Sequence, residues 1–243
     1  MGSPRFRVVT YNTHKSRGMD WKVRPDRIID VLGEIQPDII ALQEVVGDQV
    51  DYLVEKVGFG HVFGKTDVFR GHDYGNLTLS RFPIVATHNF DLSVPRRSRR
   101  GCLRTDLDIP GLGVVHFFHV HLGTSFFERR RQALKLLSNE IVVNRKLSGP
   151  RLVVGDFNEW TRGLVSRLLS VQLESADVRF HLQRKRTYPG MLPVLHLDHM
   201  YYDPELKLEA LALHRSPTAM VASDHLPLVG EFIGGSSERA IAV

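Results

Sequence analysis

The stretch Pro37-Asp38-Ile39-Ile40-Ala41-Leu42-Gln43-Glu44-Val45 decides how this chain folds. Residues 39–42 are apolar at odd and even positions alike, so a strand formed here carries apolar side chains on both of its faces. Such strands are typical of a sheet that is covered on both sides. The strand ends in the carboxylate of Glu44, which a rigid sheet would present at one edge. The stretch therefore predicts a fully buried strand with a reactive group at its end.

Further short runs have the same strand character, because they are rich in β-branched residues and are bounded by Gly, Pro, Asp or Asn. They are residues 6–10, 76–80, 84–91, 114–121, 152–154, 196–202 and 228–233. The run 152–154 is again apolar on both faces, which predicts a second covered strand. Residues 76–81 and 84–91 follow each other across a short turn, so we expect them to pair as strand-turn-strand.

Segments with helical periodicity lie between these strands. Residues 26–35 place four apolar side chains on one stripe, with Pro25 suited to the first turn. Residues 128–147 and the shorter segment 161–169 also predict amphipathic helices. This order of helices among many strands predicts a layered α/β fold with a mixed sheet or two sheets. We expect one domain over residues 1–233 and a flexible tail over 234–243.

Composition narrows the class of protein. The 243 residues are 42% hydrophobic and 24% charged, values that exclude a disordered chain, a collagen and a membrane-embedded protein. Cys102 is the single cysteine, so neither an intrachain disulfide nor a cysteine zinc site can form. The first twenty residues contain no apolar run of signal-peptide length. We expect a monomeric cytoplasmic protein without a transmembrane segment, with a secreted bacterial protein as the alternative.

Basic residues outnumber acidic ones, 32 against 27, which gives a net charge of +5. This charge is compatible with nucleic acid or an anionic membrane surface as a partner. Three clusters stand out, namely Arg96, Arg97, Arg99 and Arg100, then residues 129–131, then residues 184–186. Each cluster is as compatible with a solvated loop or helix face as with contact to such a partner. The second cluster opens a predicted helix, the unfavourable end for positive charge, which favours a role beyond helix stability.

Polar residues collect where the apolar strands end. These positions are Asn12 and His14, Glu44, His119 and His121, Asp156 and Asn158, Asp198, and Asp224 with His225. Any single Asn or Asp at such a place is most often a turn former, and the two histidines at 119 and 121 are as compatible with packing as with chemistry. The occurrence of all these groups in one chain favours a shared site at one edge of the fold.

Three other catalytic or phosphate-binding motifs are incomplete or absent in this sequence. Residues 64–66 read Gly-Lys-Thr as in a phosphate-binding P-loop, but Phe59 stands where the first glycine is needed. Ser223, Asp224 and His225 are adjacent and cannot line up as a nucleophile, base and orienting group. No Gly-x-Ser-x-Gly elbow occurs.

Taken in order along the chain, these stretches resemble the endonuclease/exonuclease/phosphatase superfamily, which includes deoxyribonuclease I and neutral sphingomyelinases. The matching stretches are residues 9–12, 37–45, 75–84, 119–122, 155–158, 197–199 and 223–227, and the resemblance spans about residues 5–233. It implies a four-layer α/β/β/α sandwich of two packed mixed sheets flanked by helices. It also implies an active site at one edge of the two sheets.

The resemblance implies a metal site. Glu44 is then the main Mg²⁺ ligand, Asn12 shapes the metal and phosphate site, and Asp224 lies near the metal. Mn²⁺ is an alternative ion. Mg²⁺ typically binds one or two carboxylates plus water and substrate phosphate, so such a sparse set is sufficient. This chain departs from many abasic-site endonucleases at His14, where those enzymes carry an acidic residue.

The resemblance also implies the catalytic groups. Asp156 would orient and deprotonate the attacking water, and Asn158 would bind a phosphate oxygen. His225 would donate to the phosphoryl group with its ring held by Asp198, and His121 would assist the leaving group or the phosphate.

The function expected from these residues is Mg²⁺-dependent phosphodiester hydrolysis. A nuclease that cleaves DNA by in-line attack of water is favoured, with Arg99, Arg100 and His14 contacting the substrate. The alternative is a hydrolase of phospholipids, similar to sphingomyelinases, or of another small phosphodiester. The sequence does not decide whether the substrate is DNA or RNA, or whether cleavage is endonucleolytic or exonucleolytic. It also does not decide the base specificity or whether one or two metal ions bind.

Overall fold

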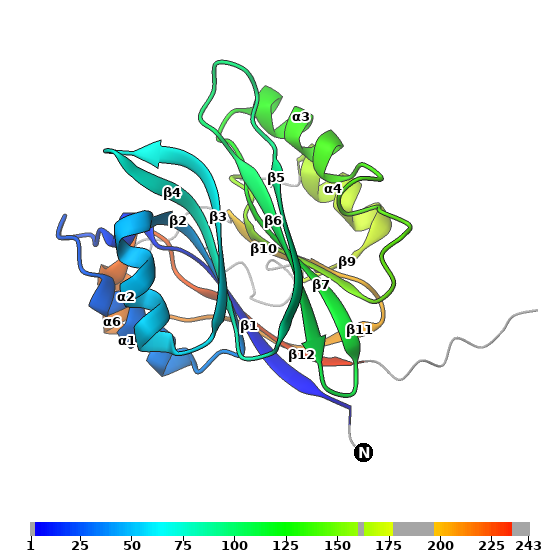
Figure 1. Ribbon diagram of the computed structural model, residues 1–243, viewed down its shortest axis with the longest axis horizontal. Coiled ribbons are helices and arrows are strands. Elements are labelled where there is room, and N and C mark those ends of the chain that lie inside the picture. The colour runs from blue at the N-terminus through cyan, green and yellow to red at the C-terminus, as the bar shows by residue number, and fades with distance from the viewer. Residues whose placement is uncertain (1–2, 160–162, 177–196, 235–243) are drawn as a thin grey trace, which may run out of the picture.

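The computed structural model describes residues 3–159, 163–176 and 197–234, and within these ranges two six-stranded sheets pack face to face (Figure 1). The first sheet has the strand order β11-β12-β1-β2-β4-β3. Its strands are β1 (Arg5–Asn12), β2 (Ile39–Val46), β3 (Gly60–Phe69), β4 (His72–Ser80), β11 (Leu206–Leu213) and β12 (Leu228–Gly234). β1 pairs with β2 in parallel and with β12 in antiparallel orientation, so the sheet is mixed.

The second sheet has the order β5-β6-β7-β8-β10-β9. Its strands are β5 (Ile84–Asp91), β6 (Gly101–Ile109), β7 (Gly113–His121), β8 (Arg151–Asp156), β9 (Glu174–Ser175) and β10 (Asp198–Tyr202). β7 and β8 are parallel, and the other described pairs of this sheet are antiparallel.

Helices cover the outer face of each sheet (Figure 1). The first sheet is covered by α1 (Pro25–Ile35), α2 (Gly47–Val57) and α6 (Pro217–Ala222), and the second by α3 (Phe126–Leu136) and α4 (Leu164–Gln172). The four-layer α/β/β/α sandwich that the family resemblance implies is confirmed. Among the described residues, none of the helices has the length and apolar character needed to span a bilayer.

The apolar strands alternate between two cores, as their sequence predicts. In β2, Ile39 and Ala41 face the core between the sheets, whereas Ile40 and Leu42 face the core under the helices. Val153 of β8 likewise faces the helices, while its neighbours face the other sheet. Both strands are therefore covered on both faces, and burial of this kind contributes roughly 25 cal/mol per Å² of apolar surface.

Strand pairing brings the polar strand ends together at one edge. Asn12 pairs with Gln43 across β1 and β2. In the other sheet Asp156 lies opposite His121 of β7 and opposite Asp198 of β10. Because the two sheets pack against each other, these ends meet on one side of the sandwich.

The expected strand-turn-strand pair of residues 76–81 and 84–91 is wrong. β4 and β5 belong to different sheets, so the chain crosses from one sheet to the other between them. Phe82 packs against the core between the sheets, and its backbone N–H donates to Ser80 Oγ at 3.0 Å. Pro83 follows and has no N–H for a ladder, and the half-buried Phe82 packs against the inter-sheet core, so a hairpin is disfavoured here.

The expected helix 128–147 is also wrong in extent, because α3 covers Phe126–Leu136 only. Beyond it, Ser138 Oγ accepts a hydrogen bond from the Glu140 N–H and Asn144 Oδ1 accepts one from the Lys146 N–H. Such side chains compete with helical hydrogen bonds and favour turns. The helix expected at 161–169 lies at Leu164–Gln172, with residues 161 and 162 outside the described ranges.

Candidate active site

A β-bulge in β2 aims Glu44 into the site. Leu42 pairs with Leu77 and Val45 pairs with Gly75, so β2 holds one residue more than β4 between these pairs. Glu44 adopts a φ of 59°, in the left-handed region. The extra residue reverses the alternation, since Val45 faces the helix-side core together with Leu42. In an unbroken strand Glu44 would point with Leu42 into that apolar layer.

A left-handed turn after β1 places a lysine on Glu44. His14, Lys15 and Ser16 have φ values of 48°, 62° and 55°, and each such residue costs on the order of 1 kcal/mol. Ser16 Oγ donates to Gln49 Oε1 at 2.9 Å and Gln49 Nε2 donates to the Lys15 carbonyl at 3.0 Å. The turn is thus held from α2, and the Lys15 ammonium forms an ion pair with Glu44 Oε2.

These contacts keep Glu44 ionised. Burial alone would raise the pKa of Glu44, but the neighbouring His121 and Lys15 groups outweigh burial and lower the pKa to about 2. Asn12 Nδ2 adds a long hydrogen bond to Glu44 Oε1 at 3.4 Å. Sequence reasoning missed Lys15, whose only signal is a basic side chain in the turn after the strand that ends at Asn12.

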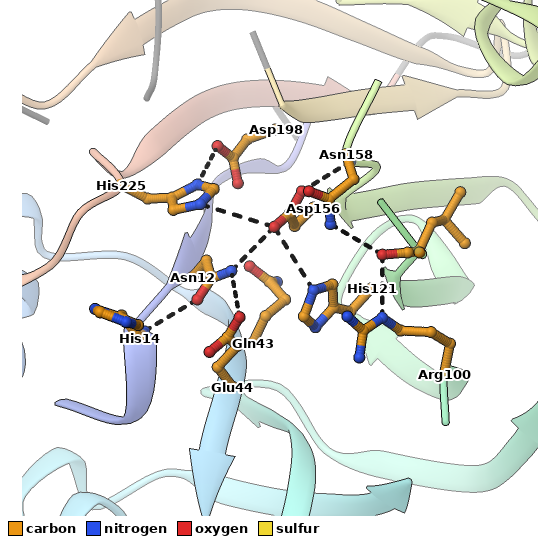
Figure 2. Close-up of polar contacts among 12 residues, drawn as sticks. Asn12, His14, Gln43, Glu44, Arg100, His121, Asp156, Asn158, Asp198 and His225 are labelled. Atoms are coloured by element: carbon orange, nitrogen blue, oxygen red, sulfur yellow. Dashed lines mark hydrogen bonds and ion pairs between the residues drawn. The ribbon is translucent and has the colours of Figure 1, made fainter. Parts of the chain in front are cut away.

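Asp156 lies at the centre of the site (Figure 2). Asn12 Nδ2 donates to Asp156 Oδ2 at 2.9 Å. The same oxygen is 3.7 Å from His121 Nε2 and 3.8 Å from His225 Nε2. Burial raises the pKa of Asp156, and the two nearby imidazole rings partly offset this effect. A buried carboxylate with a raised pKa is a better proton acceptor than an exposed one.

Asp198 and His225 pair as the sequence predicts. His225 Nδ1 lies 3.0 Å from Asp198 Oδ2, although 27 residues separate them in the chain. Ser223 Oγ donates to the Asn12 carbonyl at 2.7 Å, which ties the segment before β12 to the end of β1. Burial favours the neutral ring of His225, but the carboxylates of Asp198, Asp156 and Asp224, with Asp198 the foremost, together outweigh burial and raise the His225 pKa to about 10.

His121 has the opposite protonation state at neutral pH. Burial, together with the positive charge of Arg100, lowers the pKa of His121 to about 4. Arg100 reaches the site from the start of β6, where its Nε donates to the Leu122 carbonyl at 3.1 Å. The site therefore holds one imidazolium and one neutral imidazole on either side of Asp156, and groups whose pKa values diverge in this way can take different roles.

Asn158 enters the site through a turn, because β8 ends at Asp156. Asn158 has a φ of 49°; its N–H donates to Asp156 Oδ1 at 2.8 Å and its Nδ2 donates to the Leu122 carbonyl at 2.9 Å. Gly155 allows β7 and β8 to approach closely: its φ is 145°, and an added Cβ would lie 1.9 Å from the Val120 carbonyl oxygen.

His119 packs between the sheets, apart from His121. Its Nε2 lies 2.6 Å from Gln43 Nε2 and its Nδ1 lies 3.1 Å from Thr78 Oγ1. Burial lowers the pKa of His119 to about 3, so the ring is neutral. The sequence left both packing and chemistry open for His119 and His121. The buried contacts of His119 fit a packing role, whereas His121 lies at the polar edge and fits a role in the site.

The remaining candidate residues lie around this edge. The His14 N–H donates to Asn12 Oδ1 at 3.0 Å, and His14 Nδ1 is 3.7 Å from Asp224 Oδ1. Asp224 thus joins the site through His14. The backbone N–H of Arg99 is 3.4 Å from Asp67 Oδ2, and its side chain is exposed. The basic residues 184–186 lie outside the described residues.

A basic cleft adjoins the site. The loop before β6 contributes Arg96 and Arg97, and α3 contributes Arg130, Arg131 and the exposed ring of Phe127, around a volume of about 600 Å³. The loop leads directly to the site, because Gly101 at its end pairs with His121 in the sheet.

The oxygen ligands at this edge fit a sparse magnesium site. Glu44 supplies an ionised carboxylate, and the Lys15 ammonium on its Oε2 marks a position where a cation is favoured. No group of three or more His, Cys, Asp or Glu side chains arranged for a metal occurs in residues 3–159, 163–176 and 197–234. Mg²⁺ often takes only one or two carboxylates, so this set fits Mg²⁺ and does not fit a metal enclosed by protein ligands.

Comparison with known proteins identifies the family of this chain. The model of the Endonuclease/Exonuclease/phosphatase family matches residues 9–225. The chain is 31% identical to YbhP of Escherichia coli strain K12, over 93% of this chain and 95% of that protein.

Two solved structures illustrate the fold. The human Nocturnin catalytic domain superposes with a TM-score of 0.74 at 22% identity and covers 95% of each chain. The Bacteroides thetaiotaomicron mannosyl-6-phosphatase Bt3783 superposes with a TM-score of 0.77 at 19% identity, covering 93% of this chain and 99% of the other. At these identities the likeness shows the fold, and one fold serves several substrates. The family match and the YbhP relation show that the chain belongs to the endonuclease/exonuclease/phosphatase family of hydrolytic phosphoesterases.

Proposed function

We propose that this protein is a Mg²⁺-dependent phosphodiesterase that cleaves nucleic acid, with DNA the favoured substrate. One observation supports the chemistry above all: Asp156 Oδ2 lies between His225 and His121, at 3.8 and 3.7 Å from their Nε2 atoms. A base with a raised pKa beside two hydrogen-bond donors suits in-line attack of water on a phosphodiester.

In the proposed mechanism Asp156 holds the attacking water and accepts its proton on Oδ2. The new P–O bond forms as the P–O bond to the leaving oxygen breaks. The imidazolium of His225, held by Asp198, donates from Nε2 to a phosphoryl oxygen as negative charge builds there. Neutral His121 and the amide of Asn158 are further donors to the phosphate.

Glu44, with Asn12 and Asp224 nearby, would hold the metal ion. When bound, Mg²⁺ supplies charge neutralisation on the phosphate and stabilises the leaving oxygen. Lys15 already pairs with Glu44 Oε2, so its ammonium must move or share the carboxylate when an ion binds. Mn²⁺ would serve in place of Mg²⁺, because it accepts the same oxygen ligands.

The preference for nucleic acid rests on the basic cleft. Arg96, Arg97, Arg130 and Arg131 place four positive charges around one cleft, and the loop that carries the first two leads to Gly101, which pairs with His121. Contacts of this kind bind the phosphate backbone and weaken with salt. We also propose that the chain works as a single domain and a monomer in the cytoplasm.

The alternative substrate is a phospholipid of the sphingomyelin type or another small phosphodiester. Phe126 and Phe127 at the start of α3 are 54% and 74% exposed, and the arginines of the same helix lie next to them. Exposed aromatic rings beside basic groups also suit a lipid surface. The substrate class is therefore the point that the experiment must decide.

The test is a substrate panel with plasmid DNA, single-stranded DNA, RNA, abasic DNA, sphingomyelin vesicles and bis-nitrophenyl phosphate, each with Mg²⁺, with Mn²⁺ or with a chelator. We expect cleavage of DNA with either ion, loss of cleavage with the chelator, and loss in Asp156→Asn. Turnover of sphingomyelin without turnover of nucleic acid would move the protein to the phospholipid class. Full activity in the chelator would contradict metal dependence.

Neutralising the cleft tests the substrate contact. Arg96→Gln with Arg97→Gln should raise KM for DNA and flatten its salt dependence, with little change for bis-nitrophenyl phosphate. The matched control is Arg145→Gln with Lys146→Gln, which removes the same charge from exposed positions outside the cleft. An equal effect of both pairs would show that only the overall charge matters.

A further inference from the structure

An exposed tryptophan lies at the tip of the loop between β1 and α1. The side chain of Trp21 is 72% exposed, and its φ is 65°, in the left-handed region. Glycine or asparagine adopts this conformation at little cost, whereas a bulky residue is strained there. Neither burial nor backbone geometry explains a tryptophan at this position, and a strained residue of this kind is a reason to look for function.

The loop that carries Trp21 is rigidly held. Its backbone is closed by hydrogen bonds from the Gly18 N–H to the Lys22 carbonyl at 3.0 Å and from the Trp21 N–H to the Gly18 carbonyl at 2.9 Å. The guanidinium of Arg27 on α1 binds both oxygens of Asp20, at 2.8 and 2.7 Å. The backbone that carries the indole is thus held before any ligand binds, which reduces the entropy cost of binding.

Beside the indole lies a pocket with a volume of about 400 Å³. Positive and aromatic groups alternate around it: the Arg17 guanidinium carbon lies 4.2 Å from the Trp21 ring centroid, and that of Arg70 lies 5.4 Å from the Phe69 ring centroid. Lys15 adds a third positive charge, against one acidic lining residue, Asp48. The pocket therefore combines flat stacking surfaces with a net positive charge.

The pocket connects directly to the candidate active site. Lys15 lines it and also forms the ion pair with Glu44. The Lys15 ammonium is 5.7 Å from the Phe69 ring centroid and 5.9 Å from that of Tyr74. A group held in the pocket would thus lie next to a phosphate held at Glu44.

We propose that this pocket binds one nucleotide unit next to the scissile phosphate, with its base stacked on Trp21 and its own phosphate at Arg17 and Arg70. This inference rests on the proposed nuclease function and adds a subsite to it. Bases stack on aromatic rings and on guanidinium planes without a sequence requirement, and arginine binds phosphate through paired N–H donors. Here the exposed ring already carries a stacked guanidinium, which favours a base over an acyl chain.

The test measures binding apart from catalysis. The probe is a fluorescein-labelled hexathymidylate, titrated with full-length Asp156→Asn protein while anisotropy is recorded. Stacking of one base predicts that adding Trp21→Gly weakens binding by about 5- to 150-fold. Trp21→Phe should retain most of the affinity. Because glycine relieves the left-handed strain, the unfolding temperature of Trp21→Gly should stay the same or rise.

Gln36→Gly is the matched control, since Gln36 is exposed and also has a positive φ, 52°, at the end of α1. It should leave hexathymidylate binding unchanged. Unchanged affinity of Trp21→Gly, or a loss that parallels a fall in its unfolding temperature, would overturn the subsite. The subsite would also be overturned if Trp21→Gly lost binding to phosphatidylserine vesicles and kept its binding to the oligonucleotide. The loop would then be a membrane contact.

The substrate panel separates this inference from the proposed function. If the wild-type protein cleaves nucleic acid and Trp21→Gly binds the oligonucleotide normally, the subsite alone is wrong. If Trp21-dependent binding is found and the wild-type protein cleaves no nucleic acid, the proposed function is wrong and the binding site stands.

Discussion

Asp198→Asn removes the charge that holds His225 as an imidazolium and keeps the shape of the side chain. His225 is buried, with a pKa raised to about 10 chiefly through Asp198 at 3.0 Å, against the opposing effect of burial. Asp156 and Asp224 remain and continue to favour the charged ring. The substitution therefore weakens the preference for the imidazolium without abolishing it.

The size of the change follows from the hydrogen bond. A hydrogen bond to a charged group contributes about 1.5–3 kcal/mol, and one pKa unit corresponds to 1.36 kcal/mol. The pKa of His225 should thus fall by about 1–2 units in Asp198→Asn. The alkaline limit of activity should fall by the same amount, because the mechanism needs the charged ring. At neutral pH the less firmly held ring should lower turnover by about 10- to 100-fold.

The assay is an NMR titration of the imidazole C–H signals in chelator, with His225→Gln to assign the signal, together with pH profiles of DNA cleavage. Glu34→Gln is the matched control, since it breaks the exposed pair in which His214 Nε2 lies 2.6 Å from Glu34 Oε2. That variant should leave the His225 signal and the pH profile unchanged.

Two results would refute the reasoning. In one, the His225 signal titrates in Asp198→Asn at the same pH as in the wild-type protein. In the other, the turnover losses of Asp198→Asn and His225→Gln add in full in the double variant, which would show two independent roles.

Three further predictions concern the metal ligand, the pH dependence of stability and the strand approach. Glu44→Gln should weaken Mn²⁺ binding, measured by electron paramagnetic resonance, and lower turnover by a factor on the order of 100 or more; unchanged Mn²⁺ affinity would remove Glu44 from the metal site. The raised pKa of His225, about 10, should add stability that is fully present below about pH 6.5 and is lost as the pH rises through 10, in urea unfolding of wild-type protein compared with His225→Gln. Gly155→Ala should lower the free energy of unfolding by roughly 3 kcal/mol because its Cβ would meet the Val120 carbonyl at 1.9 Å, whereas Gly33→Ala, with open space around its Cβ, should be neutral or stabilising.

Apolar patterning sufficed to predict a layered α/β fold with a mixed sheet or two sheets, and the family resemblance added the four-layer arrangement. The double-faced runs 39–42 and 152–154 require cover on both sides, and two helix-covered sheets provide it. The predicted pairing of residues 76–81 with 84–91 was wrong, because short separation favours a hairpin and only the packing of the half-buried Phe82 against the core between the sheets reveals the crossing.

The candidate site was predictable to the extent that it depends on strand ends. Register alone brings Asp156 beside His121 and Asp198. The contribution of Lys15 was missed, because it depends on a left-handed turn of three non-glycine residues that no propensity predicts. The bulge at Glu44 was missed for a similar reason, since one extra residue in β2 becomes visible only against its partner strand.

The position of β12 between β1 and β11 has a consequence for biosynthesis. Of the described strands, the first in chain order, β1, pairs on one side with the last, β12, with Arg5 opposite Ile233, and His225 lies just before β12. Until β12 emerges, β1 has an open edge with unpaired backbone groups, the kind of surface at which nascent chains associate. The candidate site should therefore stay incomplete until β12 and the segment that carries His225 have been synthesised.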